Sequence, residues 1–595
     1  MITTGTGSKR GHWMIRILLI TGWFLGWEVN SAAAQNFQPP FPRIGVIYFY
    51  EANIPEEIWK NHDLIVVRLW YPEIARKIKA KYPEKIVLAT NNVIDGTAIN
   101  PPDDYLIPTL DGSCIKGWHQ KHPGDCLYDG TNFCPIVNGK RWNDFLTDFL
   151  AERTDWSVFD GTFWDSWAGS ISWQESYDQV DFNRNGIADN REQKDLADKY
   201  WREGNRLIVE KLRQKTPPGK VVVAHEASPE EVGYLNGLGD EDWEGNSWEW
   251  FYPNVWRRFQ KEAVTPRVNF IEARGKPEDF QRMRFGLTTA CLLDAFFTMD
   301  DGNYAHRYTY IYDEYFANLG YPTSEAEEIR KGVYVRYFDN GAVVVNASGK
   351  PQTITASDLR GGPYYRFLGG QVPDFNNGEK LGSIRLEGSI SGRKQTGDGV
   401  LLFKQPTVLI APIIVDNVAI NMTSPGNQPA RLEGNWIQQD QGKLRNTNAY
   451  ALNYGWDEYG PPYAYTHAGN GESRAIYTPT IGVAGEYDVY EWHPFHGNAE
   501  DDYIEAQAVP YVIKHARGTT TGTIDQSKNS GRWNYLGRFY FEKGTSGYIM
   551  ISNNVSSGIV LADAFKFVYA ATNNDTFSAD RTPPKAPTGV KIEKN

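Results

Sequence analysis

The sequence predicts an α/β fold, a (β/α)8 TIM barrel, followed by all-β sandwich domains, and three observations support this order. Short apolar runs alternate with helical stretches from about residue 40 to 323, which is typical of a parallel sheet. Eight such runs fit a (β/α)8 barrel, and no Gly-rich phosphate-binding sequence follows the first run to favour a doubly wound sheet. From about residue 332 the apolar residues recur with a period of two, as in antiparallel strands.

Residues 1–34 have the pattern of a secretory signal peptide. Lys9, Arg10 and Arg16 are basic, an apolar run over 17–27 follows, and small residues offer a cleavage site near Ala34. The apolar run is too short to span a bilayer, and no later run is long enough. We therefore expect a secreted or extracellular protein without a transmembrane anchor.

The net charge and the composition indicate which classes of partner the protein binds. The net charge of −12 shows no basic footprint, so we expect no nucleic-acid partner. Aromatic residues make up 14% of the chain, and rings beside acidic and amide side chains are typical of sugar-binding clefts, although β-rich proteins also use many rings. Export permits disulfides. We expect one bond among Cys114, Cys126 and Cys134, with the pairing open, and a buried, unpaired Cys291.

The barrel is predicted over residues 35–330. Its helical patterns include 192–215 and 280–287. Its eight strands are predicted at 44–50, 64–68, 86–90, 156–164, 221–225, 233–238, 267–273 and 290–299.

Carboxylates follow the last five predicted strands, where barrel enzymes place their chemistry. A single strand-end acid is often a cap or an ion-pair residue, but several acids facing one axis would repel one another unless they had a function. Paired carboxylates with aromatic neighbours suit glycosidic cleavage, in which one protonates the leaving oxygen and the other attacks carbon or activates water. The strand-end acids are Asp165, Glu226, Glu272, Asp300 and a strand-6 stretch with Glu241, Glu244 and Glu249.

Two motifs connect the barrel with known families. Asp160-Gly-Thr-Phe-Trp-Asp165 resembles the strand-4 motif of several barrel glycosidase families. The run 282–300, with His306 and the segments 312–315 and 319–322, resembles the glycosyl-hydrolase-like barrel proteins called hypothetical glycosyl hydrolase family 15. The resemblance covers roughly residues 40–350 and implies hydrolysis of a polysaccharide or glycan. It implies that Asp165 is the nucleophile or base and that a strand-6 acid donates the proton.

Among the strand-6 acids we prefer Glu244, which lies between Trp243 and Gly245, and then Glu249; Glu226 and Glu272 are further candidates. The alternative function is a non-catalytic glycan-binding or cell-surface protein on a glycosidase-like barrel. A lyase or an esterase is a weaker alternative, and no G-x-S-x-G elbow favours the esterase. The predicted substrate-binding residues are Asp160, Trp164, Trp167, Asn91, His225, Arg284, Asp300 and His306.

Residues 181–192 have the pattern of an EF-hand calcium loop. Gly186 stands at position 6, where the loop turns sharply, and Ile187 at position 7 would offer its carbonyl. We expect a structural Ca²⁺ there, and a polar capped turn is the alternative. The oxygen-bearing side chains at positions 1, 3, 5, 9 and 12 are Asp181, Asn183, Asn185, Asp189 and Glu192.

The second half of the chain is predicted to be all β. A hairpin over 333–346 opens a small β-sandwich at 331–412. Within 413–571, the segments 485–492, 523–526, 531–537 and 560–567 resemble the golvesin or xanthan-lyase C-terminal-like domain, a jelly roll. This resemblance implies attachment to carbohydrate, including cell-surface or extracellular-matrix glycans, and a folding spacer is the alternative. Residues 572–595 are predicted to be a linker with the start of a fibronectin type III-like segment.

Overall fold

The computed structural model describes residues 35–49, 56–92, 99, 101–117, 126–165, 169–243, 248–300, 310–391, 394–418, 427–438, 463–496 and 504–570. The predicted signal peptide at 1–34 and the predicted linker at 572–595 lie outside the described residues. In the described part, no helix is long and apolar enough to cross a membrane.

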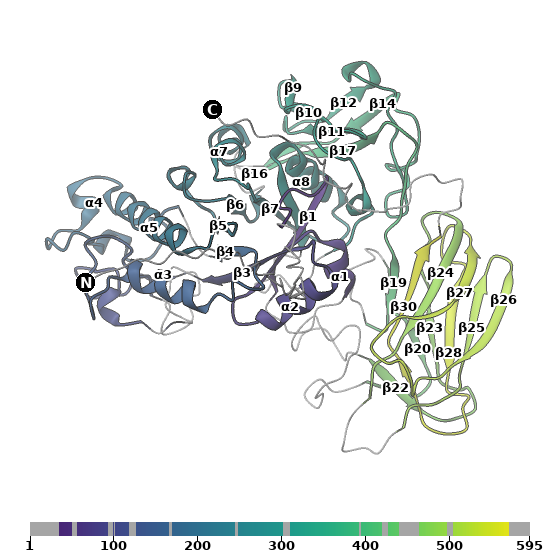
Figure 1. The fold of residues 1–595 in the computed structure, drawn as a ribbon. Coiled ribbons are helices and arrows are strands. Elements are labelled where there is room, and N and C mark those ends of the chain that lie inside the picture. Colours follow the sequence, from purple (N-terminus) through teal and green to yellow (C-terminus); the bar gives the residue numbers. More distant parts are fainter. Residues whose placement is uncertain are drawn as a thin grey trace, which may run out of the picture. The chain divides into compact units, whose positions relative to one another are not determined.

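Eight parallel strands close into a barrel in the order β1 to β8, which confirms the predicted fold class (Figure 1). Each strand pairs with its sequence neighbour, and β1 closes the barrel against β8. The strands are β1 Arg43–Phe49, β2 Leu64–Arg68, β3 Ile86–Asn92, β4 Gly161–Asp165, β5 Val221–His225, β6 Gly237–Asp240, β7 Asn269–Arg274 and β8 Ala295–Asp300.

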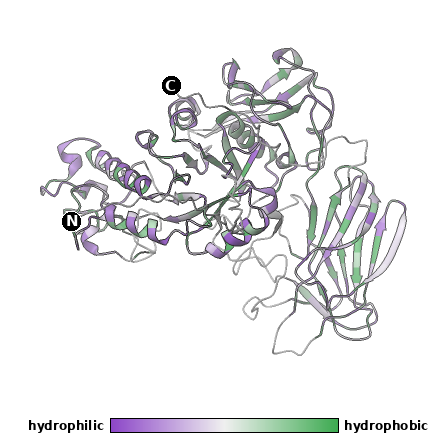
Figure 2. Cartoon of the chain, viewed as in Figure 1, coloured by the Kyte–Doolittle hydropathy of each residue, from purple (hydrophilic) through white to green (hydrophobic). Residues whose placement is uncertain are grey.

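Helices follow most of these strands. Short 3-10 or π turns occupy Asp103–Tyr105, Tyr177–Gln179, Pro229–Glu231, Tyr252–Trp256, Asp313–Phe316 and Ala356–Asp358. The helices are α1 Glu56–Asn61, α2 Pro72–Lys81, α3 Trp142–Arg153, α4 Asp189–Glu192, α5 Leu196–Lys215, α6 Trp248–Phe251, α7 Arg257–Glu262 and α8 Phe280–Leu293. In Figure 2 the hydrophilic colour is concentrated on helices such as α4 and α5, whereas strands of the last domain show hydrophobic and hydrophilic segments side by side.

Alternate strand residues fall into two separate apolar clusters. Val221 and Val223 of β5 belong to a cluster inside the barrel with Phe163, Phe270 and Phe296, whereas Val222 and Ala224 pack toward the helices. Glycines make room for the large rings inside. A Cβ at Gly239 would overlap the Phe163 ring, and one at Gly45 would overlap Phe270. The barrel interior is therefore a filled core, and a polar group can be reached only at its ends.

Four predicted strands begin later than expected. β4 starts at Gly161, β6 at Gly237 and β7 at Asn269, and β8 starts at Ala295 because α8 continues to Leu293. Asp294 then ends the helix with φ +56°, in the left-handed region. Periodicity alone cannot separate a buried helix from a buried strand in a short apolar run.

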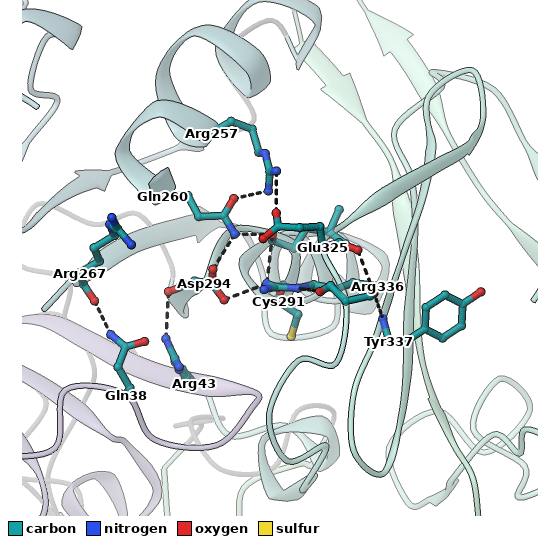
Figure 3. A network of polar contacts seen from close by, with 12 residues as sticks. Gln38, Arg43, Arg257, Gln260, Arg267, Cys291, Asp294, Glu325, Arg336 and Tyr337 are labelled. Atoms are coloured by element: carbon teal, nitrogen blue, oxygen red, sulfur yellow. Dashed lines mark hydrogen bonds and ion pairs between the residues drawn. The ribbon is translucent and has the colours of Figure 1, made fainter. Parts of the chain in front are cut away.

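A polar network joins the end of α8 to the next domain (Figure 3). Arg336 donates to the carbonyl of Cys291 at 2.7 Å and to Asp294 at 2.9 Å, and Arg43 at the start of β1 donates to the Asp294 carbonyl at 3.2 Å. Cys291 is buried and unpaired, as predicted. The disulfide joins Cys114 to Cys126, which leaves Cys134 buried and unpaired.

The predicted hairpin forms the centre of the second domain. Its main sheet has the order β17-β11-β10-β9, in which β10 is Val333–Tyr337 and β11 is Gly341–Asn346. Arg284 of α8 binds Asp398 of β17 through two hydrogen bonds of 2.9 and 3.2 Å, so this sheet packs on the barrel's last helix. The remaining strands are β9 Glu327–Arg330, β12 Gln352–Thr355, β13 Leu368–Gly369, β14 Ser383–Leu386, β15 Ser389–Ser391, β16 Lys394–Thr396, β17 Asp398–Phe403 and β18 Val408–Leu409.

The last domain is a sandwich of two large antiparallel sheets. One sheet has the order β19-β30-β24-β27 and the other β20-β23-β28-β25-β26, and a small third sheet has the order β21-β22-β29. One core holds Phe565 and Phe567 of the first sheet together with Ile549 and Ile551 of the second. The strands are β19 Ile413–Asp416, β20 Arg431–Glu433, β21 Ile437–Gln438, β22 Ala464–His467, β23 Arg474–Tyr477, β24 Gly485–Trp492, β25 Val509–His515, β26 Gly518–Ile524, β27 Asn534–Phe541, β28 Tyr548–Ser552, β29 Ile559–Ala562 and β30 Ala564–Tyr569.

Candidate active site

Three charged side chains meet at the C-terminal end of the barrel. Asp165 ends β4, His225 ends β5, and Glu241 directly follows β6. Asp165 continues the inward face of Phe163, and His225 continues the inward face of Val221 and Val223. The alternation that fills the barrel with apolar side chains therefore also directs these polar groups toward the axis.

His225 lies between the two carboxylates. Its Nδ1 is 3.5 Å from Asp165 Oδ1, and its Nε2 is 3.7 Å from Glu241 Oε1. Glu226 also approaches, with its Oε1 3.7 Å from the same Nε2. One ligand atom from each of Asp165, His225 and Glu241 lies within 4.8 Å of the others. This short separation brings the two carboxylates within reach of one small substrate group.

The surrounding acids hold His225 in its charged form. Burial by itself would lower the pKa of the imidazole, but Glu241, Glu226 and Asp165 outweigh it and raise the pKa to about 10. The imidazolium is thus positive at neutral pH. It reduces the repulsion among the acids that surround it.

Arg274, at the end of β7, supplies a second positive charge. It pairs with Glu241 and with Glu272, whose Oε2 lies 2.9 Å from the guanidinium Nε. Burial would lower the pKa of Arg274, but Glu272, Glu241 and Asp300 raise it further. Glu272 is fully buried and also accepts the backbone N–H of Asp242 at 3.1 Å. Glu272 therefore anchors Arg274, which in turn orients Glu241.

The structure brings together five of the residues that were predicted from the sequence. Asp165, His225 and Glu226 line the cluster, and the buried Glu272 and Asp300 lie beneath Arg274. Glu244, Trp167 and His306 lie outside the described residues.

Asp160 and Trp164 do not line the barrel mouth. Asp160 precedes β4, so it lies at the opposite end of that strand from Asp165. There it accepts the Val87 N–H at 2.8 Å and pairs with Lys79 at 2.6 Å. Trp164 is 1% exposed and packs toward the helices, because it alternates with Phe163. The strand-4 motif therefore combines a structural acid and a core ring with one acid at the mouth.

Arg284, Asn91 and Glu249 also differ from the prediction. Arg284 lies on α8, outside the barrel, where Asp398 binds it and its guanidinium lies 3.8 Å from the Phe375 ring centroid. Asn91 shares the outward register of Val87 and Ala89. Glu249 is exposed on α6, whose Trp248 packs on Phe285 and Tyr334 outside the barrel. A strand-adjacent position does not place these side chains at the mouth.

The sequence interpretation underrated Glu241 and Arg274. Glu241 was one of three acids after strand 6, and the preference for Glu244 followed its flanking Trp. The usable signal is strand phase: Glu241 is two residues beyond Gly239, which faces the interior, and Arg274 is two beyond Glu272. Asp240, which lies between Gly239 and Glu241 in the chain, faces outward and accepts the Trp256 indole N–H at 2.5 Å.

Among the described residues, Asp165, His225 and Glu241 are the only set of three His, Cys, Asp or Glu side chains whose ligand atoms all lie within 4.8 Å of one another, a spacing that could hold a metal ion. Glu241 is already paired with Arg274, however, and that guanidinium supplies the positive charge that a metal would bring. The arrangement is therefore better suited to acid–base and nucleophilic chemistry by carboxylates.

The predicted calcium loop gathers its oxygen-bearing side chains. Asn185 Nδ2 is 2.7 Å from Glu192 Oε1, and Asn183 Nδ2 is 3.1 Å from both Asp189 Oδ1 and Glu192 Oε2. Asp181 accepts the N–H groups of Asn185 and Gly186 at 3.1 and 2.9 Å. Burial, and then the charges of Asp181 and Glu192, raise the pKa of Asp189 to about 6. Gly186 has φ +85°, as the sharp turn requires.

Comparison with known proteins identifies the last domain. Residues 428–569 match the family model of the golvesin C-terminal domain, which confirms the module named from the sequence. Over 116 residues the chain is 38% identical to a xanthan lyase from Bacillus sp. (strain GL1). That region is 19% of this chain and only 12% of the lyase, so the chain spans a small part of this relative.

Among solved structures, the glycoside hydrolase domain of PelA from Pseudomonas aeruginosa is 13% identical, with a TM-score of 0.29. The aligned region covers 45% of this chain and 97% of that one. Ega3 from Aspergillus fumigatus, in complex with galactosamine, is 10% identical over 44% of this chain and 93% of that one, with a TM-score of 0.28. A Paenibacillus xanthan lyase is 20% identical over 43% of this chain and 26% of that one, with a TM-score of 0.22.

Proposed function

We propose that the protein is a secreted glycoside hydrolase that cleaves the O-glycosidic bonds of a polysaccharide or glycan with Asp165 and Glu241. The observation that carries this proposal is the close approach of these two carboxylates at the barrel mouth, with His225 between them. Asp165 is the nucleophile, and Glu241 replaces Glu244 and Glu249 as the strand-6 proton donor. The signal-peptide pattern at residues 1–34 supports secretion.

The separation of the two carboxylates favours retention of configuration. Retaining glycosidases hold their carboxyl groups about 5–5.5 Å apart, whereas inverting enzymes need about 6.5–9.5 Å to admit a water molecule. An oxygen of Asp165 lies within 4.8 Å of an oxygen of Glu241. In the first step Asp165 attacks the anomeric carbon, and Glu241, which must be protonated when the substrate binds, gives its proton to the departing oxygen and becomes a carboxylate. In the second step Glu241 deprotonates water, which then releases the sugar from Asp165.

His225 and Arg274 support this chemistry without entering the covalent steps. The imidazole of His225 lies 3.5 Å from Asp165 Oδ1, where it attracts the carboxylate and helps to orient it for attack. Arg274 orients Glu241 through the hydrogen bond that its guanidinium donates to Oε2, which the protonated and the ionised acid can both accept, and buried Glu272 holds Arg274 in turn. Orientation of reacting groups by buried, paired side chains is a large part of enzymatic rate enhancement.

We also propose that residues 181–192 bind a structural Ca²⁺. The residues fit the ion, since carboxylate and amide side chains of the right spacing converge and three acids lie close enough to affect one another. Asp181, Asn183, Asn185, Asp189 and Glu192 would hold it, with the carbonyl of Ile187. The ion would neutralise the acids and stabilise the connection between β4 and α5.

A glycan-panel digestion tests the proposed activity. We expect new reducing ends from at least one polysaccharide, and a product of retained anomeric configuration by NMR. Azide should rescue Asp165→Ala with an inverted glycosyl azide product, and it should rescue Glu241→Ala on a substrate with a good leaving group with retention. Rescue in the reverse pattern would exchange the two roles. Unsaturated product ends, which absorb ultraviolet light, would instead establish a lyase.

A further inference from the structure

An aromatic strip covers part of the outer face of the golvesin-like domain. It is formed by Tyr490 and Trp492 of β24, Tyr535 of β27, the preceding Trp533, and Lys566 of β30. Burial alternates strictly along β24, with Tyr487, Val489 and Glu491 inside and Asp488, Tyr490 and Trp492 outside. The strip therefore lies on the side of the sheet that faces away from the domain core.

The rings of the strip are arranged in two neighbouring pairs. The Tyr490 and Tyr535 centroids are 5.3 Å apart, and those of Trp492 and Trp533 are also 5.3 Å apart. Lys566 connects the pairs, with its Nζ 4.4 Å from the Trp533 centroid and 5.2 Å from that of Tyr490. Tyr535 is 57% exposed, which is high for so large a side chain.

Polar groups border the rings. Arg538 binds Asp488 through two hydrogen bonds of 2.8 Å, and the Tyr535 hydroxyl donates to Asp488 at 3.2 Å. Side chains of this kind offer donors and acceptors beside flat apolar faces. A pyranose chain needs this combination, because each sugar has an apolar C–H face and a rim of hydroxyls.

A β-bulge brings the two parts of the strip together. Tyr535 and Arg538 are three residues apart, so a regular strand would place them on opposite faces. The pairing of β24 with β27 shifts register between Val489 and Tyr490, and Gly537 has φ +147°, a conformation that favours glycine. The extra residue lets Tyr535 face Tyr490 while Arg538 faces Asp488. Bulges commonly re-aim side chains at functional positions.

We infer that this strip is a binding surface for a polysaccharide chain, separate from the barrel mouth. The rings stack on successive sugars, while Asp488, Arg538 and Lys566 contact their hydroxyl or acidic groups. Only the class of ligand in this inference rests on the proposed function, since the strip would hold the same glycan that the barrel cleaves. It requires no catalytic step, so its binding can be measured independently of turnover.

Affinity electrophoresis of the full chain tests the inference. Native gels contain xanthan, glucomannan or glycol chitosan, which represent acidic, neutral and amino polysaccharides. The Asp165→Asn variant is used throughout so that no glycan is degraded. We expect retardation in at least one gel, and an affinity about tenfold lower when Tyr535→Ala or Lys566→Ala is added. Lys514→Ala, an exposed lysine on β25 of the other sheet, is the matched control and should leave retardation unchanged.

The outcomes separate this inference from the hydrolase proposal. Absence of retardation in all three gels overturns the binding surface, and so does equal retardation with and without Tyr535. If the wild-type protein hydrolyses no glycan but Tyr535-dependent retardation persists, the hydrolase proposal fails while the binding surface stands. Circular dichroism of each variant confirms that the sandwich is folded.

Discussion

The barrel mouth and the aromatic strip, which we propose bind the same class of ligand, are built from different kinds of side chain. The mouth consists of carboxylates held by His225 and Arg274, and its Glu272 is fully buried. The strip consists of rings on an open sheet, and its Tyr535 is more than half exposed. Chemistry at a glycosidic bond needs charges that are oriented and shielded from water, whereas attachment needs only flat surface and hydrogen bonds. A change in one region should therefore leave the other intact.

The largest expected effect is at the two carboxylates of the mouth. Asp165→Asn and Glu241→Gln remove charge without changing shape, so each should lower kcat by on the order of a thousandfold or more. The thermal melt should change little, and retardation in glycan gels should persist. Steady-state kinetics and melting curves measure both effects. Full activity of either variant would remove that residue from the mechanism.

Two arginines with buried acidic partners sharpen the distinction between catalysis and stability. Arg274→Ala leaves Glu272 without its cation, and Arg284→Ala does the same to Asp398 in the second domain. Each should cost on the order of 3 kcal/mol in unfolding free energy, because breaking a buried pair strands a charge. Denaturant unfolding measures this cost.

Only Arg274→Ala should also lower kcat when both variants are assayed well below their melting temperatures. Arg284 is the matched control, since it forms a comparable pair outside the barrel. An equal loss of kcat in both variants would indicate that stability, and not the orientation of Glu241, explains the effect.

Calcium should affect the mouth but not the strip, and its effect should depend on pH. Burial raises the pKa of Asp189 to about 6, above its usual value of about 4, so this group costs stability as the pH rises through that interval. Ca²⁺ binds the ionised carboxylate, so the stabilisation that it adds should grow over the same interval. At a hundredfold excess over Kd it should approach about 2.7 kcal/mol.

Melting curves with calcium or chelator, near pH 5 and near pH 7, check this expectation. Magnesium should substitute poorly. Asp181→Ala should abolish the response to chelator, and turnover should fall with the melt because the loop follows β4. No calcium effect at either pH would reduce the segment to a polar turn, whereas an equal effect at both would remove Asp189 from the calcium ligands.

The smallest expected effect concerns one hydroxyl of the strip. Tyr535→Phe keeps the ring but removes the hydrogen bond to Asp488, so the affinity for glycan should fall only about twofold to threefold. Gel retardation that matches Tyr535→Ala would shift the binding role from the ring to the hydroxyl.

The fold class, the golvesin-like module and the acids at the strand ends could all be predicted from the amino-acid sequence. These follow from local patterns: eight alternating runs, an alternating all-β half, and motifs whose residues are close together in the chain. The elements that were predicted at their observed positions, such as β2 Leu64–Arg68 and β5 Val221–His225, have an unbroken apolar signal between clear breaks.

Which of these residues meet could not be predicted, because it depends on how the strands pack in the folded chain. Asp160 and Asp165 belong to one motif but lie at opposite ends of β4, and Glu241 rather than Glu249 points to the barrel axis. The pairing of Cys114 with Cys126 and the bulge that sets Tyr535 beside Tyr490 were likewise decided by the fold. The reason is that a side chain's direction depends on where its strand begins and on its phase. Both are set by packing between segments far apart in the chain.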